Sequence, residues 1–361
     1  MDKKYSVIVK TGDSEMRAMR NLSSEDLSKI LPVVELTRGR AKNIGAIEGP
    51  KFIYPYDSKL KKINEIFAGV QIALDVTSDE GLSSQEIDQL FNYSNGYANW
   101  ISLLNELCSK GLSLIPYILR NYHDENFEEN FKEQVCSLSA NFSEVMYRCT
   151  LDDEGIVDDV QLICKNLNES CNLLIILDCG WVAPASYKDP ANMCIIRIQQ
   201  LKEILGAKKN SIVVCSTTFP NNVSEIGDDS SDIFNLREID LYGLVAKEYP
   251  EVIYGDYGSI NPVRNDQIIM ARGWIPRIDV ALKDKIYYYR ERKGSRTYSD
   301  TYTSVARKAV SDKKFPSSIK AWGISQIQNC ALGDAPSASP SFWISVRMNS
   351  HIIQQINRLD L

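Results

Sequence analysis

Short apolar runs recur along the chain and alternate with stretches of helical period. The runs are rich in valine and isoleucine, and each is followed by polar residues. They span residues 5–10, 30–36, 70–76, 112–119, 144–151, 173–180, 211–218 and 251–258. Runs that are this short and continuously apolar are typical of strands buried on both faces, as in a parallel sheet.

The stretches between these runs have the spacing of amphipathic helices. In "YANWISLLNELCSK", apolar side chains recur at Trp100, Leu103, Leu104 and Leu107, which lie on one face of a helix. Eight strands joined by helical crossovers over residues 1–262 predict a (β/α)8 barrel. A doubly wound open sheet is the alternative, although no glycine-rich turn follows the first run, as a dinucleotide-binding fold would require.

The pattern changes in the last 100 residues. "PRIDVALKDKIYYYRERKG" predicts two antiparallel strands around Lys283–Lys285, or a long β-arm, and "YSDTYTSVARKAVSDKKF" predicts a helix with a polar face. "SPSFWISVRMNSHIIQQINRL" predicts a short strand followed by a closing helix. We therefore expect residues 263–361 to form a C-terminal α+β extension that packs on one mouth of the barrel.

Acidic residues stand where several apolar runs end. In a barrel, these positions share the rim where catalytic groups lie. The candidates for a catalytic site are Glu35, Asp75, Asp178 and Asp256. Side chains alternate between the two faces of a strand, and the sequence does not say which parity faces inward. Each residue could therefore instead cap the loop or helix that follows it.

Converging carboxylates raise one another's pKa and favour a bound cation. With few histidines in the chain, Glu35, Asp75 and Asp178 would select Mg²⁺ or Mn²⁺ rather than zinc. No cofactor is certain from the sequence. Four further residues fall on the same rim and are candidates for binding a substrate: Lys10, Arg38, His123 and Arg148. The three cations could supply counter-charge to the carboxylates, or bind a phosphate or carboxylate of the substrate. The alternative for each cation is a solvated charge or an ion pair with a neighbouring carboxylate, and His123 could instead belong to a surface loop.

Composition narrows the classes of function. The net charge of −6 and pI near 5.3 argue against a general nucleic-acid-coating role, although a local basic groove is compatible with them. Nine cysteines without a CxxC pair indicate free thiols in a reducing compartment. No apolar run reaches the length of a membrane span, and no signal peptide opens the chain, so we expect a cytoplasmic protein.

Three segments resemble the Beta-protein family. "YSVIVKTGDSEMRAMRNLSSEDLSKILPVVEL" has that family's strand, helix and "I-x-P-x-x-E" second strand, ending at Glu35. "YGDYGSINP" at 254–262 and "SFWISVRMNSHIIQQI" at 341–356 resemble its eighth strand and closing segment. The resemblance implies a phage- or prophage-encoded protein found in cassettes that block infection by other phages. It supplies no catalytic residues.

Two hypotheses follow. The first is a component of an anti-phage defence module, acting as sensor, effector or regulator through contacts with a phage, host or cassette protein. The second is a metal-dependent hydrolase, similar to a phosphodiesterase or nuclease, with its acidic site at the barrel rim. The sequence leaves the substrate, partner and oligomeric state open.

Overall fold

Eight parallel strands form a ring in the computed structural model, which describes residues 3–45, 51–121, 123–221, 230–263 and 273–361. Their order around the sheet follows their order in the chain, and β1 pairs with both β2 and β11. β6 and β7 meet at a parallel bridge between Tyr117 and Met146, where the Ile118 amide donates to the Met146 carbonyl at 2.8 Å. The strands are β1 (Tyr5–Lys10), β2 (Leu31–Leu36), β5 (Gln71–Val76), β6 (Ser113–Pro116), β7 (Glu144–Thr150), β8 (Asn172–Trp181), β9 (Asn210–Thr217) and β11 (Ile253–Asp256).

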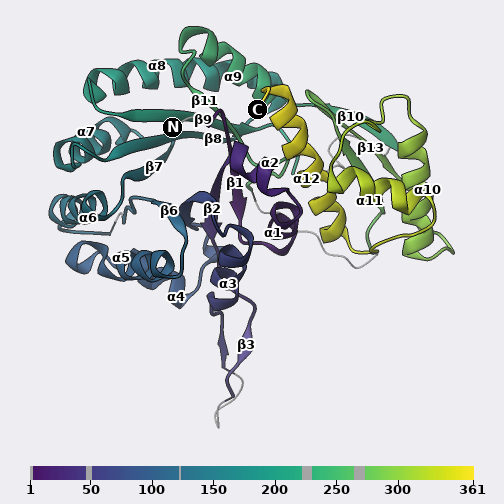
Figure 1. Cartoon of the computed structure of the whole chain (residues 1–361), viewed down its shortest axis with the longest axis horizontal. Helices are drawn as coiled ribbons and strands as arrows, with labels where there is room; N and C mark the ends of the chain where they lie inside the picture. Colours follow the sequence, from purple (N-terminus) through teal and green to yellow (C-terminus); the bar gives the residue numbers. More distant parts are fainter. Residues whose placement is uncertain (1–2, 46–50, 122, 222–229, 264–272) are drawn as a thin grey trace.

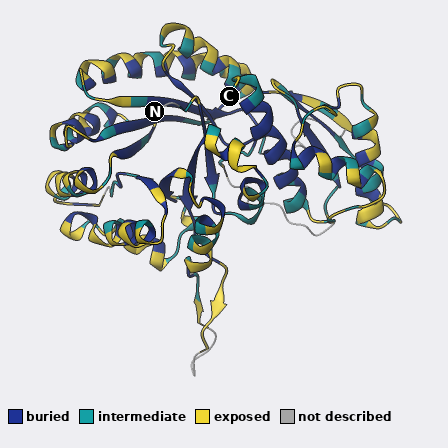
Figure 2. Cartoon of the chain, viewed as in Figure 1, coloured by how far each residue is buried: buried dark blue, intermediate teal, exposed yellow. Residues whose placement is uncertain are grey.

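This ring confirms the predicted barrel, and each of the eight apolar runs overlaps one of its strands. An open sheet is ruled out because the ends of the strand order, β6 and β7, are themselves neighbours. Helices surround the strands, and their outer faces are the exposed ones (Figures 1 and 2). They are α1 (Asp13–Arg20), α2 (Ser24–Lys29), α3 (Asp57–Ile66), α5 (Ser94–Ser109), α6 (Phe127–Asn141), α7 (Ile156–Asn166), α8 (Lys188–Leu205) and α9 (Arg237–Glu248).

The barrel strands are buried on both faces, which explains their continuous apolar runs. Alternate residues pack inside the ring, among them Ala73, Leu174 and Ile176. Their neighbours Leu74 and Ile175 pack outward against the helices. This alternation settles the parity that the sequence leaves open, because Asp75 and Asp178 each lie two residues beyond an inward-facing side chain.

A smaller α+β unit follows the barrel. β10 (Ser231–Asn235), β13 (Lys285–Arg290) and β12 (Arg277–Ala281) form an antiparallel sheet in that order. The last two are the predicted strand pair, and α10 (Tyr298–Ser311) is the predicted helix. α11 (Trp322–Ala331) and α12 (Pro340–Arg358) complete the unit. The short strand expected before the closing helix was wrong, because the helix begins at Pro340 and includes that segment.

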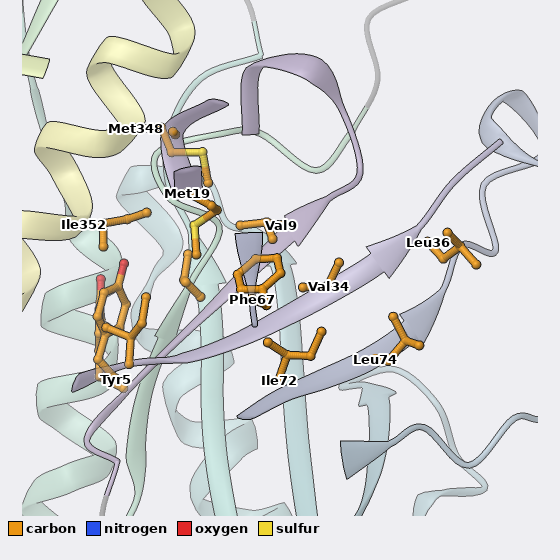
Figure 3. Packing of buried hydrophobic residues seen from close by; sticks show 14 of the residues in the cluster. Tyr5, Val9, Met19, Val34, Leu36, Phe67, Ile72, Leu74, Met348 and Ile352 are labelled. Carbon is orange, nitrogen blue, oxygen red and sulfur yellow. The ribbon is translucent and has the colours of Figure 1, made fainter. Parts of the chain in front are cut away.

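α12 also serves as the eighth helix of the barrel. It packs against α1, α2 and β1 on one side and against β12 on the other. Met348 and Ile352 belong to the same buried cluster as Met19 and Tyr5 (Figure 3). The division expected at residue 262 stays a prediction. Two elements pack on the other side of this division. β10 precedes residue 262 but joins the later sheet, and α12 follows it but packs on the barrel.

β3 (Lys42–Asn43) and β4 (Phe52–Ile53) form a hairpin that projects away from the barrel (Figure 1). Within the described ranges, we find no helix whose length and apolar content would let it span a bilayer.

The role of α12 can be tested by truncating one of its core side chains. Ile352 is fully buried, so Ile352→Ala should lower the free energy of unfolding by about 2–5 kcal/mol, because the cavity cannot collapse completely. Leu332→Ala is the control, since Leu332 is 85% exposed and should change stability by less than about 0.5 kcal/mol. Urea unfolding measures both. Equal stability of the two variants would contradict the packing of α12 on the barrel.

Candidate functional site

Three of the four predicted carboxylates converge inside the carboxyl-terminal mouth of the barrel. The strand register places Lys10, Glu35 and Asp75 at one level on neighbouring strands. Asp178 reaches the same region from β8. All three carboxylate residues are buried, with exposures of 6% for Glu35, 3% for Asp75 and 4% for Asp178. The expectation that distant acidic residues share a rim pocket therefore holds for these three.

Arg148 lies at the centre of the three carboxylates. Its Nη1 donates to Asp75 Oδ2 at 2.7 Å and to Glu35 Oε2 at 3.1 Å, and its Nε donates to Asp178 Oδ2 at 2.8 Å. The planar guanidinium offers five N–H donors in a fixed fork, which allows one side chain to bind three acidic partners. Arg148 thus joins β7 to β2, β5 and β8. We call these four side chains the Arg148 cluster.

Tyr257 adds a hydroxyl to this cluster. It donates to Asp178, with its oxygen 2.5 Å from Oδ1 and 2.6 Å from Oδ2. Arg148 Nη2 in turn donates to the Tyr257 oxygen at 3.4 Å. Sequence reasoning missed Tyr257 and selected the aspartate before it. The two-residue period of β11, continued from the inward-facing Ile253, points to Tyr257 as the inward-facing side chain.

Asp256 does not join the Arg148 cluster, which corrects its predicted place beside the other three acids. Its side chain leaves the opposite face of β11 and lies between the barrel and α12. There it accepts hydrogen bonds from Tyr5 at 2.8 Å and Tyr254 at 3.1 Å, and contacts His351 Nε2 at 2.8 Å. Burial raises the pKa of Asp256, but the charge of His351 and the hydrogen bonds from His351, the Gly258 amide and Tyr5 outweigh burial and lower it below its ordinary value. Asp256 therefore anchors α12.

Burial sets the protonation behaviour of the Arg148 cluster. It raises the pKa of Asp75 to about 6, against the opposing effect of Arg148, and the nearby Glu35 charge adds to the rise. Burial also lowers the pKa of Arg148, but the charges of Asp178, Tyr257, Asp75 and Glu35 raise it well above its ordinary value. The cluster therefore holds a permanent cation beside a carboxyl group that titrates close to neutral pH.

The other predicted substrate-binding residues are not members of the cluster. Lys10 Nζ is 3.7 Å from Glu35 Oε1 and 3.8 Å from Asp79 Oδ2, so it borders the cluster. The Arg38 guanidinium lies over the Tyr54 ring at 4.5 Å. His123 is exposed on the loop between β6 and α6. Arg148 is thus the predicted cation that occupies the site.

The predicted metal site is not formed in the described part of the chain. No group of three or more His, Cys, Asp or Glu side chains there is arranged to hold a metal ion. The physical reason lies in Arg148, whose guanidinium takes the central position that Glu35, Asp75 and Asp178 were expected to give to Mg²⁺ or Mn²⁺.

A cavity of about 200 Å³ opens beside the Arg148 cluster. Its walls combine the cluster residues with aromatic rings and with a second group of charged side chains. Besides the cluster, the lining includes Phe91, Tyr117, Arg120, Tyr147 and Asp153. The walls therefore offer carboxylate acceptors, aromatic surface and two fixed cations. This combination suits a small polar ligand that carries hydroxyl or amino groups.

Comparison with known proteins gives a family match across the chain. The model of the family described as Beta protein matches residues 5–357. "Protein beta" of Enterobacteria phage P4 is 26% identical over 361 residues, covering 98% of this chain and 92% of the phage protein.

Solved structures give weaker likenesses. The biosynthetic arginine decarboxylase SpeA from Campylobacter jejuni aligns with a TM-score of 0.40 and 8% identity, and this chain covers 56% of its length. The spore cortex-lytic enzyme SleL of Bacillus megaterium QM B1551 aligns with a TM-score of 0.27 and 10% identity, with 85% of this chain and 68% of that chain covered. Both similarities are too weak to bear on function.

Replacing the central cation tests why the cluster is not a metal site. Arg148→Ala leaves three buried carboxylates around one vacated position, so we expect calorimetry to detect Mn²⁺ binding, with Kd of roughly 10⁻⁴–10⁻³ M, as in weak oxygen-ligand sites. The wild type and Arg148→Lys, which keeps a positive charge, should give no binding heat. Strong Mn²⁺ binding by the wild type would contradict the central role assigned to Arg148.

The raised pKa of Asp75 predicts a pH-dependent stability. The folded state holds the Asp75 proton up to about pH 6, whereas the unfolded chain releases it near the ordinary value of 3.8. The wild type should therefore lose roughly 1–3 kcal/mol of unfolding free energy relative to Asp75→Asn between pH 4 and pH 6.5, and no more above that. Urea unfolding across this range measures the difference. For the exposed Asp152→Asn control, the free energy of unfolding should depend on pH as it does for the wild type. The same pH dependence in Asp75→Asn would refute the raised pKa of Asp75.

Proposed function

This chain belongs to the Beta protein family, and on that premise we propose that it is a component of an anti-phage defence module whose barrel mouth senses a small polar ligand. The match to a phage P4 protein over nearly the whole chain supports a phage-related role. The single observation that carries the sensing role is the Arg148 cluster, a buried charge network that opens directly onto a cavity.

The cavity walls define the class of ligand. Four acidic side chains line it, against two arginines, so the walls carry a net negative charge when all six are ionised. This balance disfavours phosphate esters and favours neutral or cationic molecules whose hydroxyl or amino groups donate to the carboxylates. The volume of about 200 Å³ is below the range of ~300–1,000 Å³ for drug-sized ligands, which points to a metabolite-sized molecule.

The same contacts offer a way to transmit binding. Arg148 links β7 to three other strands, and Tyr257 extends the network to the end of β11. A ligand that hydrogen-bonds to Asp75 or Asp178 competes for groups that also hold Arg148. Binding therefore changes the forces on several rim loops together, and these loops are the surface that a phage, host or cassette protein would contact.

A hydrolase is the second candidate, in a form that uses Arg148 in place of a metal. The observation that favours it is the position of Asp75, which lines the cavity and accepts a hydrogen bond from Arg148 at 2.7 Å. Burial raises the pKa of this carboxyl group to about 6, so it could donate a proton near neutral pH. Asp178 would supply negative charge to the same reaction centre. The net charge of the walls favours a neutral glycoside or ester as substrate over a phosphodiester.

We place the protein in the cytoplasm as part of the same proposal. All nine cysteines are free thiols, and several are buried in the core of the barrel. Free thiols in this number suit a reducing compartment, where cassette and phage proteins also meet.

Phage challenge of cells carrying the complete cassette tests the proposal. Asp178→Asn and Arg148→Lys nearly keep side-chain volume but disturb the charge network, so both should weaken protection, with phage plating efficiency rising at least about tenfold. Glu203→Gln on the exposed face of α8 is the control and should protect fully. Thermal unfolding confirms that each variant is folded. Full protection by folded Asp178→Asn and Arg148→Lys variants would contradict a role for the cluster.

A further inference from the structure

The overall negative charge of the chain conceals a basic C-terminal unit. Residues 273–361, all of which the structure describes, contain 14 lysines and arginines and 7 aspartates and glutamates, a net charge of +7. The whole chain carries −6, so residues 1–272 carry −13 (−6 less +7). The argument from net charge against nucleic-acid binding therefore applies to the barrel and not to this unit.

The positive charges gather along β13 and α10. Arg296 and Lys308 both reach Glu291, at 2.7 Å and 3.3 Å. Two residues earlier on the chain, Tyr289 donates to Asp312, which also pairs with Lys314 at 2.8 Å. Glu291 directly follows β13, and its amide still donates to the Pro276 carbonyl. Positions two residues apart in an extended segment share a face and lie about 7 Å apart, so these contacts are neighbours on one surface. We call it the β13–α10 surface: Tyr289, Arg292, Lys293, Arg296, Tyr298, Lys308 and Lys314.

A stacked aromatic pair borders the same surface. Trp274 and Tyr298 have ring centroids 4.1 Å apart and planes inclined by 13°. Lys293 lies over the Tyr298 ring at 5.5 Å. Both rings are partly exposed. The pair therefore places accessible aromatic surface beside several cations.

We propose that the β13–α10 surface binds single-stranded nucleic acid. The lysines and arginines contact successive phosphates, and a base stacks on the Trp274–Tyr298 pair. Proteins that bind single strands combine these two features, a cationic track and an aromatic stacking platform. A membrane surface would instead call for large exposed apolar side chains among the cations, and the residues of this surface are tyrosine, lysine and arginine. The inference does not depend on the ligand proposed for the barrel mouth.

Fluorescence anisotropy of the full-length protein with labelled 20-mers of oligo-dT and oligo-U tests the proposal. We expect saturable binding at 50 mM NaCl that weakens with salt. Contacts to three to five phosphates predict a slope of log K against log salt of roughly −2 to −3.5 for single strands. Duplex DNA of the same length should bind more weakly, because its bases cannot reach the aromatic pair.

Two sets of variants separate local contacts from overall charge. Arg292→Glu, Lys293→Glu and Arg296→Glu together should weaken oligo-dT binding by more than about tenfold. The control variant makes the same change in net charge at exposed positions on the barrel, with Lys61→Glu, Lys110→Glu and Lys247→Glu combined. It should weaken oligo-dT binding much less. Tyr298→Ala should weaken binding about tenfold through lost stacking, whereas Tyr298→Phe keeps the ring and should bind like the wild type.

Each contrary result has a definite meaning. Absence of binding to either 20-mer at 50 mM NaCl overturns the proposal. Equal loss in the two triple variants also overturns it, because overall charge would then explain the binding. A third result would point to a membrane surface instead of nucleic acid. In that case the protein binds neither 20-mer but sediments with vesicles of phosphatidylcholine and phosphatidylglycerol, and the first triple variant does not. Duplex binding as tight as single-strand binding, together with an unaffected Tyr298→Ala variant, would refute the stacking role.

Discussion

One guanidinium group controls the charge of the barrel mouth. Three carboxylates that reach the interior from β2, β5 and β8 would repel one another strongly in a region shielded from water, and Arg148 from β7 compensates them. Breaking a buried ion network by removing one member typically costs about 3–5 kcal/mol, because the remaining charges stay buried without compensation. The candidate site and the integrity of the barrel mouth therefore rest on the same contacts.

The fold could be predicted from the sequence because a strand buried on both faces appears as a short, continuously apolar run. All eight apolar runs became barrel strands, and their alternation with amphipathic stretches indicated the crossovers. The closing segment shows the limit of this reasoning. "FWISV" has the composition of a strand, yet it lies in the first turns of α12, where Trp343 and Val346 are buried on a helix that has neighbours on two sides. Tertiary packing there outweighs intrinsic preference.

The sequence predicted which strand ends carry the acids of the site, but not which of these acids face into the barrel. The position of an acid at the end of a run indicated the rim, but it could not tell inward from outward, because a shift of one residue reverses the face. Asp75 and Asp178 face inward, whereas Asp256 faces α12 and leaves the inward position to Tyr257. The described residues do not form the predicted metal site, for a different reason. Arg148 was recognised as a possible counter-charge, but no pattern in the sequence fixes the place of a long side chain among three acids on other strands.

The return of α12 to the barrel has a consequence for how the chain is made. Asn349 donates to the backbone carbonyls of Ala18 and Asn21, more than 300 positions earlier in the sequence. A growing polypeptide cannot form these contacts until α12 has left the ribosome, and contacts between such distant segments slow folding. The outer surface of β1 therefore stays without its final cover while the residues between β1 and α12 are being made. Its apolar side chains are then open to chaperones, or to other nascent chains, until the last helix arrives.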